Sequence, residues 1–304
     1  MRISSLYNSD AMLAQLGVNG TRMSKLMEQM ATQKRINVPS DDPVAATRLV
    51  QLNREQSAIK QYQSNISRLS GSLASQEAHV SAMSNQLLSL NDKLLAAANG
   101  THSSEDMNGF GTELSSMLDS LVASINAQNE SGSYLFSGTK TDAKPVVWDE
   151  AQGKYVYQGN DGSRETTVAN GVSVTENTNV VQAFGNGSDL EMLNKLKALS
   201  EKMQDPDIPV SDYQDEMQEM LTLSSDPRDK VAAMFTDLGG RQNRLTMLGD
   251  AHTDVSTAND QVVRDLSDTD WATTSINLQL YTNSVQVTNK AYSMISQLSL
   301  FSML

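Results

Sequence analysis

The amino-acid sequence predicts a mainly helical fold, in which long antiparallel arms from both termini form a hairpin of coiled-coil type around a small β-rich insertion. Two observations carry this prediction. Apolar residues recur in alternating steps of three and four over long stretches near both ends of the 304-residue chain, which is typical of helices packed along their length. Between these stretches, short β-branched and aromatic runs alternate with turn residues, which is typical of antiparallel strands.

A loose apolar stripe of helical spacing occupies the first 35 residues. Gly17 and Gly20 lie within it and lower its helix propensity. We expect a terminal helix here whose apolar face needs a partner, because a short amphipathic helix is marginal by itself. The members of the stripe are Leu6, Leu13, Leu16, Met23, Leu26, Met27 and Met30.

The strongest repeat runs from Ile59 to Ala97, and only Gln76 interrupts it. Five heptads of this kind predict one long helix that keeps a single face against a partner. Residues 40–42 offer capping oxygens, and Pro43 follows them at a first helical position, which proline fits well. Together they mark the start of the helix. Asn99-Gly100 gives a stop signal. We therefore predict a helix over 43–98, about 84 Å long at the usual helical rise.

A shorter amphipathic helix is predicted over 104–128, antiparallel to the long one. Within it, Gly109-Phe110-Gly111 has the composition of a broken helix start and not of a nucleotide-binding loop. Helical spacing returns over 189–224, with a break at the prolines of 205–209. The sequence thus predicts additional helices on both sides of the insertion.

Two further repeats make up the C-terminal arm. The first runs over 231–266, and its three polar members can fix the register between helices. The second follows a capping segment at 267–270 and continues to the end of the chain. The polar members of the first repeat are Arg241, His252 and Asn259, and the second repeat consists of Leu280, Ser284, Val287, Ala291, Met294, Leu298 and Phe301.

Short runs typical of β-strands fill about 132–185. We expect strands at Tyr134-Leu135-Phe136, Val146-Val147-Trp148, Tyr155-Val156-Tyr157, Thr166-Thr167-Val168 and Val172-Ser173-Val174. Turn signals separate them at Ser137-Gly138, Gln152-Gly153, Asn160-Asp161-Gly162 and Asn170-Gly171, and a hairpin turn explains the third of these. The aromatic residues of these runs leave open a small-ligand binding module, although a small β core needs aromatic residues in any case.

Charge and composition exclude several classes of protein. The chain has no cysteine, so disulfide scaffolds, thiolate metal sites and cysteine nucleophiles are excluded. Its net charge of −13 argues against nucleic-acid binding. Residues 1–60 carry eight Lys and Arg against five Asp and Glu, a balance of +3 that leaves −16 for the remainder. This split predicts either attraction between the head of one copy and the body of another, weakened by salt, or ordinary surface variation.

Catalytic, cofactor and metal residues are not indicated. His79, His102 and His252 have no second ligand at a metal-binding spacing, and His252 falls on a heptad position where packing is the expected role. His79 lies next to Val80, a position of the long heptad repeat, and is expected to be exposed. Sequence motifs for phosphate loops and nucleophile elbows are absent. The carboxylate pairs Asp41-Asp42 and Asp268/Asp270 precede helices, where capping explains them. The sequence predicts no enzyme and no cofactor.

Five segments together resemble the bacterial flagellin family. They are residues 1–4, 34–43 (KRINVPSDDP), 132–138 (GSYLFSG), 238–245 and 299–304. The RINVPSDDP and YLFSG segments are more similar to the members that join hook and filament than to the filament subunit, which stays the alternative.

The resemblance implies an inner tube domain of residues 1–42 with 268–304, a rod domain of 43–130 with 189–267, and an outer domain of 131–188. It further implies a structural adaptor that transmits torque in the extracellular flagellum and is exported from the cytoplasm through the flagellar secretion channel. The implied partners are neighbouring copies in a ring, an adjacent hook-associated protein, flagellin and a cytoplasmic export chaperone. The residues expected at the assembly interface are Leu6, Leu13, Leu16, Met23, Val287, Met294, Leu298 and Phe301.

Overall fold

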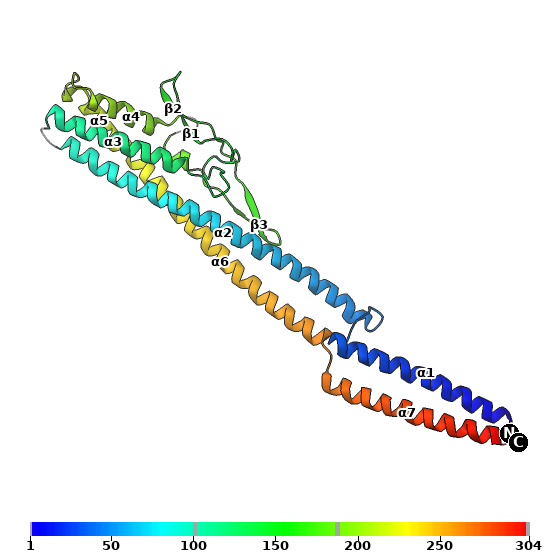
Figure 1. Ribbon diagram of the computed structural model, residues 1–304. Helices are drawn as coiled ribbons and strands as arrows, with labels where there is room; N and C mark the ends of the chain where they lie inside the picture. Colours follow the sequence, from blue (N-terminus) through cyan, green and yellow to red (C-terminus); the bar gives the residue numbers. More distant parts are fainter. Residues whose placement is uncertain (1, 100–101, 186–188, 302–304) are drawn as a thin grey trace. The chain divides into compact units, whose positions relative to one another are not determined.

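The computed structural model describes the backbone of residues 2–99, 102–185 and 189–301, and the side chains of 7, 9–99, 102–185 and 189–295. The fold is mainly helical, as predicted, with two β-hairpins in the middle of the chain (Figure 1). The chain forms two compact units. We call residues 1–59 with 253–304 the terminal unit, and residues 60–252 the central unit.

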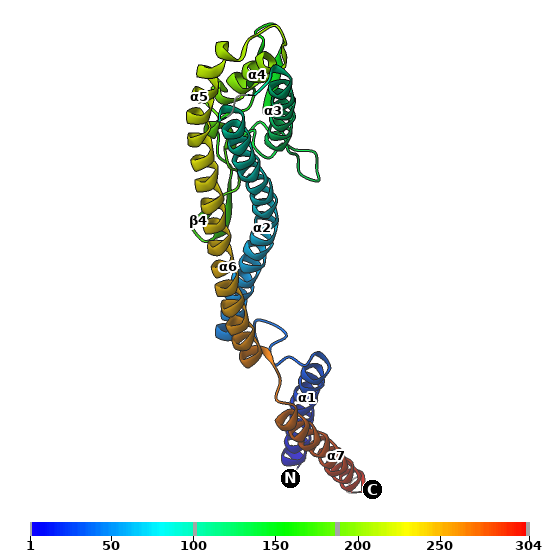
Figure 2. The same ribbon diagram turned by 90° about the vertical axis from the view of Figure 1, so that its left-hand side faces the viewer.

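Two antiparallel helix pairs build the terminal unit. Helix α1 (Arg2–Thr32) lies beside α7 (Trp271–Phe301), and the first turns of α2 (Pro43–Ala98) lie beside the end of α6 (Ser225–Ser267) (Figures 1 and 2). The Arg22 guanidinium donates to the Tyr281 hydroxyl at 3.2 Å and lies over its ring, which joins α1 to α7. Helix α2 spans Pro43 to Ala98, so the predicted long helix is confirmed with the same ends.

The central unit contains the main hydrophobic core. The remainder of α2 and α6 packs there with α3 (Ser104–Ile125), α4 (Glu191–Gln204) and α5 (Gln214–Leu223). Two 3₁₀ turns, η1 (Val180–Ala183) and η2 (Val210–Asp212), precede α4 and α5 respectively. Most heptad positions of α2 are buried in this core, because their period keeps one face turned inward. These positions include Leu73, Val80, Met83, Leu87, Leu90 and Leu94.

The insertion consists of two separate antiparallel hairpins. Strands β1 (Val146–Asp149) and β2 (Lys154–Tyr157) form the first, with Val147 opposite Val156. Strands β3 (Glu165–Ala169) and β4 (Val172–Thr175) form the second, with Thr166 opposite Val174. The turns predicted at Gln152-Gly153 and Asn170-Gly171 connect these strands.

Two predictions for the insertion are wrong. The run Tyr134-Leu135-Phe136 forms no strand, and its only ladder contact is an isolated bridge between Gln128 and Tyr134. Its apolar side chains instead fill the core, where Phe136 is fully buried. Asn160 forms no hairpin turn either. It lies between the two hairpins, and its side-chain oxygen accepts from the Thr139 N–H at 2.8 Å, so side-chain hydrogen bonding replaces strand pairing there.

Polar residues of the long helices anchor the second hairpin. Gln76, the one interruption of the α2 repeat, is buried and donates to the Glu176 carbonyl at 2.8 Å. His252 stacks on Tyr62 and has its Nε2 atom 2.7 Å from the Val168 carbonyl oxygen, so the predicted packing role of this histidine is confirmed. The prediction that His79 is exposed is wrong. It is half-buried, with its ring edge against Phe136.

The Gly109-Phe110-Gly111 segment corrects another expectation, because it lies inside α3 without interrupting it. A Cβ atom on Gly111 would lie 2.9 Å from the Met203 Cβ of α4, whereas a Cβ on Gly109 would meet nothing within 4 Å. Gly111 is therefore the point of close approach between α3 and α4.

Alanine at the two glycines is expected to change stability in opposite directions. Gly111→Ala should lower the free energy of unfolding by about 1–3 kcal/mol through overpacking against α4. Gly109→Ala should raise it by about 0.5–1 kcal/mol, because alanine has the better helix propensity. Urea unfolding followed by circular dichroism measures both variants. Equal effects at the two positions would contradict the close approach.

Candidate functional site

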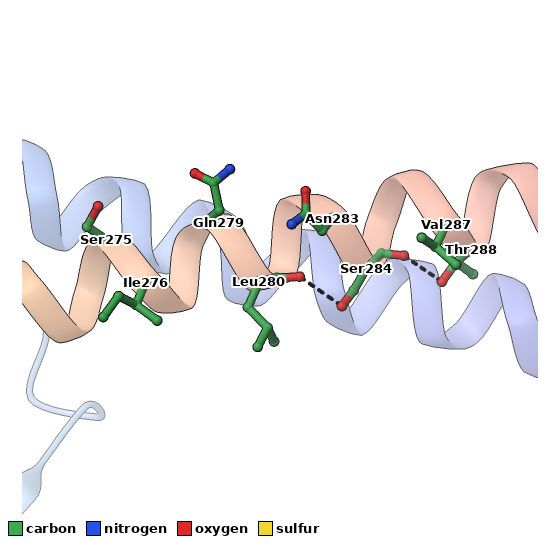
Figure 3. Close-up of a pocket in the computed structure, with 8 residues that line it drawn as sticks. All are labelled: Ser275, Ile276, Gln279, Leu280, Asn283, Ser284, Val287 and Thr288. Carbon is green, nitrogen blue, oxygen red and sulfur yellow. Dashed lines mark hydrogen bonds between the residues drawn. The ribbon is translucent and has the colours of Figure 1, made fainter.

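The outward face of α7 carries an exposed apolar stripe. Ile276, Leu280, Val287 and Met294 are 68%, 56%, 67% and 60% exposed. Their spacing of four, seven and seven residues keeps them on one side of the helix. Figure 3 shows Ile276 and Leu280 pointing from α7 to the same side. Together these residues form an exposed row of apolar side chains on the terminal unit, with polar residues such as Asn283 and Ser284 between them.

The opposite face of α7 packs on α1. Thr274 is buried, and Thr282 has its hydroxyl 3.8 Å from the Met23 sulfur. Tyr281, beside Thr282, binds Arg22. Helix α7 therefore has one face covered by α1 and an apolar face that is exposed. A shallow groove follows the exposed face, and residues of α7 line it, including Ser275, Ile276, Gln279, Leu280, Asn283 and Val287 (Figure 3).

The eight residues predicted at the assembly interface separate into three groups. Leu13, Val287 and Met294 are exposed. Leu16 and Met23 are half-buried, and Met23 contacts α7. The side chains of Leu6, Leu298 and Phe301 lie outside the described residues. The structure adds Ile276, which the sequence analysis missed; extending the Leu280 repeat back by one helical turn would have found it.

Charge is distributed unequally between the two units. The terminal unit has nine Lys and Arg against ten Asp and Glu, a net charge of −1. The central unit has fourteen against twenty-six, a net charge of −12. The positive balance of the N-terminal arm is offset because residues 253–304, with two basic and five acidic residues, fold against it. The nearly neutral unit is thus the one that exposes the apolar stripe.

The candidate carboxylates have structural roles. Asp42 caps α2 by accepting from the Ala45 N–H at 3.0 Å, and Asp270 caps α7 in the same way. Asp41 does not cap a helix, which corrects part of the prediction. The Lys25 ammonium beside it and the N–H groups of Asn37 and Val38 lower the pKa of Asp41 to about 2. This carboxylate stays ionised at neutral pH and ties a loop to α1.

The aromatic residues of the insertion pack against the protein itself. Trp148 meets Tyr155 edge to face and lies under the Lys197 ammonium at 4.8 Å. The Tyr157 hydroxyl donates to the Asn160 carbonyl at 3.0 Å, and burial raises the pKa of Tyr157 to about 12. These contacts give Trp148, Tyr155 and Tyr157 partners within the chain, which favours the packing role that a small β core requires.

A polar cavity of about 800 Å³ lies in the central unit between segment 161–185 and α6. Thr178 Oγ1 and Asn179 Oδ1 are buried there without a hydrogen-bond partner. Arg241 is engaged with the Asn177 carbonyl and with Asp237. A cavity with such a lining is expected to be hydrated.

Neither a metal cluster nor a membrane-spanning helix occurs in the part of the chain that the structure describes. No three His, Cys, Asp or Glu side chains among these residues converge as metal ligands. None of the helices over this part has both the length and the apolar character that crossing a bilayer needs.

Comparison with known proteins identifies relatives over nearly the whole chain. Residues 3–141 match the bacterial flagellin N-terminal helical region. Flagellar hook-associated protein 3 of Escherichia coli (strain K12) is 28% identical over 295 residues, which cover 91% of each chain.

Two solved structures extend the comparison to the fold. The structure of a protein described as a flagellar hook-associated protein from Vibrio parahaemolyticus is 38% identical and covers 75% of this chain and 100% of its own, with a TM-score of 0.68. The flagellar junction protein FlgL of Legionella pneumophila shares the fold, with 16% identity, a TM-score of 0.59 and coverage of 73% and 100%. The chain therefore belongs to the flagellin-related family of flagellar hook-associated proteins, which are structural proteins and not enzymes.

Proposed function

We propose that this chain is the structural adaptor at the junction between hook and filament. The observation that carries the proposal is the exposed apolar stripe on α7, which lies on the nearly neutral unit of a hook-associated family member. An exposed apolar row of this kind favours burial against other subunits. The partners we propose are copies of the chain in a ring, an adjacent hook-associated protein and flagellin, with an export chaperone in the cytoplasm before secretion.

We assign the proposed structural roles to three parts of the chain. Residues 1–42 with 268–304 would form the inner tube, residues 43–130 with 189–267 the rod, and residues 131–188 the outer domain. The 56 residues of α2 form one uninterrupted helix. A long continuous helix resists bending and twisting better than linked short ones, which supports torque transmission from hook to filament. We place the chain in the extracellular flagellum after export.

Deletion and restoration of the gene test this function. Cells without the gene are expected to have hooks without attached filaments and to release flagellin into the medium. Restoring the gene should return one layer of density between hook and filament in reconstructions of isolated flagella. Normal filaments in the deletion strain would overturn the proposal. If the purified chain forms long filaments by itself, it is a filament subunit instead.

The distribution of charge predicts how association between copies responds to salt. Because the terminal unit is almost neutral and the central unit carries −12, long-range electrostatics between copies is repulsive. Association is therefore expected to strengthen as the salt concentration rises from about 50 to 500 mM. At the upper end the Debye length is well below 10 Å, so the repulsion between copies is screened. Sedimentation velocity over this range measures it. Weaker association at high salt would instead support attraction between head and body.

A further inference from the structure

The two chain segments that join the helices of the terminal unit lie side by side. The first crossing, residues 33–42, connects α1 to α2, and the second crossing, residues 268–270, connects α6 to α7. Lys34 and Asp268 form an isolated antiparallel bridge. The Arg35 N–H donates to the Ser267 carbonyl at 2.6 Å, and the Thr269 N–H donates to the Gln33 carbonyl at 3.1 Å. Two segments more than two hundred residues apart in sequence are thus joined by their backbones.

Arg35 connects the ends of two helices at this point. Its guanidinium donates to the Leu266 carbonyl at 3.0 Å, which is one of the carbonyl groups that α6 leaves unpaired at its C-terminus. The same group forms an ion pair with Asp42 at 3.2 Å, and Asp42 caps the N-terminus of α2. A positive charge is favoured at a helix C-terminus and a negative one at an N-terminus. Arg35 therefore bridges α6 and α2 with complementary charge at both ends.

Helix α1 is fastened to the same place by polar contacts. Lys25 forms an ion pair with Asp41 at 2.8 Å. The Gln29 amide donates to the Arg35 carbonyl at 2.8 Å. The Thr32 hydroxyl lies 2.9 Å from the Asn37 side-chain oxygen. Every helix that enters or leaves the crossings therefore has a polar link to them.

Apolar burial contributes little here. Of the ten residues in the first crossing, all of which the structure describes, Ile36 alone is buried. None of residues 268–270, which are also described, is buried. Arg35 and Asp42 keep 44% and 32% of their side-chain surface exposed. Contacts of this kind are individually weak and screened by salt, unlike an apolar core. Regions with few buried contacts open locally before the rest of a protein unfolds.

We propose that the two crossings form a polar latch, centred on Arg35, which opens to release the α1–α7 pair from α2 and α6 while all four helices stay intact. The latch is a device of the terminal unit by itself and does not depend on which subunits the α7 stripe contacts. Arg35 acts as a positioning residue, since it holds the ends of α2 and α6 together.

Amide hydrogen exchange at residues 35 and 269 tests the latch in the full-length chain. Arg35→Ala is expected to raise exchange at Thr269 by about tenfold, since it removes two hydrogen bonds to a charged group. Arg48→Ala is the matched control, because Arg48 is exposed on α2. It should leave exchange at Thr269 unchanged. Exchange in α3 and α4 of the central unit should be the same in all variants.

Two further measurements test the latch even if the Arg35→Ala chain folds poorly. Asp42→Asn keeps a capping side chain but removes the charge that pairs with Arg35, so exchange at Thr269 should rise by a few-fold. In the unaltered chain, raising salt from about 50 to 500 mM should speed exchange at residues 35 and 269 but not in α3. Unchanged exchange at Thr269 in Asp42→Asn and at high salt would overturn the proposal, as would an equal increase throughout the terminal and central units.

Discussion

Replacing Leu280 and Val287 together by aspartate is expected to abolish incorporation of the chain into flagella. Both side chains are more than half exposed on the outward face of α7, so the substitution leaves the α1 contact and the fold intact. Burying one such apolar side chain is worth about 1.5–3 kcal/mol, and a buried unpaired carboxylate costs more. Association through this face should therefore weaken by a hundredfold or more, at about 1.4 kcal/mol per tenfold.

The measurement is the amount of variant chain in flagella isolated from a strain that lacks the normal gene, together with swimming motility. Gln286→Asp with Asn289→Asp is the matched control, because these exposed polar residues of the same helix do not line the groove. The control adds the same two charges without removing apolar surface. Normal incorporation of the Leu280→Asp, Val287→Asp chain would exclude the α7 stripe as an assembly surface.

The second large effect is expected from Phe136→Ala in the central unit. Phe136 is fully buried, its ring meets the edge of His79, and its carbonyl lies 3.4 Å from the Tyr157 hydroxyl. Truncating a buried phenylalanine leaves a cavity that the surrounding helices and hairpins cannot fill, which costs about 3–5 kcal/mol. The free energy of unfolding of the central unit should fall by that amount.

The chain has two tryptophans, so replacing Trp271 by phenylalanine leaves Trp148 as the single tryptophan. Its fluorescence then reports on the central unit during urea unfolding. Phe235→Ala is the matched control. Phe235 lies on α6 in the same unit and is 41% exposed, so its truncation should cost less than about 1 kcal/mol. Equal losses for the two phenylalanine variants would show that the segment 134–136 is not part of the core.

The extents of the helices were predictable because their signals are local. A heptad repeat, a proline at the first helical position and a capping aspartate act within a few residues of one another, and α2 begins at Pro43 as these signals require. The interruption at Gln76 was also visible in the sequence. Its reason was not, because the Glu176 carbonyl that it binds lies 100 residues further along the chain.

The β-rich region was predicted less well, since short apolar runs do not distinguish a strand from a buried loop. Tyr134-Leu135-Phe136 has the composition of a strand, yet Phe136 gains more from burial in the core than from pairing at a sheet edge. Asn160 similarly has turn propensity but uses its side chain to bind Thr139, on the other side of the first hairpin.

The sequence by itself determined the helical class, the ends of the long helix, the absence of cysteine chemistry and the resemblance to the flagellin family. The tertiary structure alone decided which apolar helix faces remain exposed to solvent. Leu16 and Met23 have the same helical spacing as Leu13, but pairing of α1 with α7 partly covers the first two and leaves Leu13 exposed. The same pairing cancels the positive charge of the N-terminal arm. Both outcomes depend on contacts such as Arg22 with Tyr281, 259 residues apart, which local periodicity does not encode.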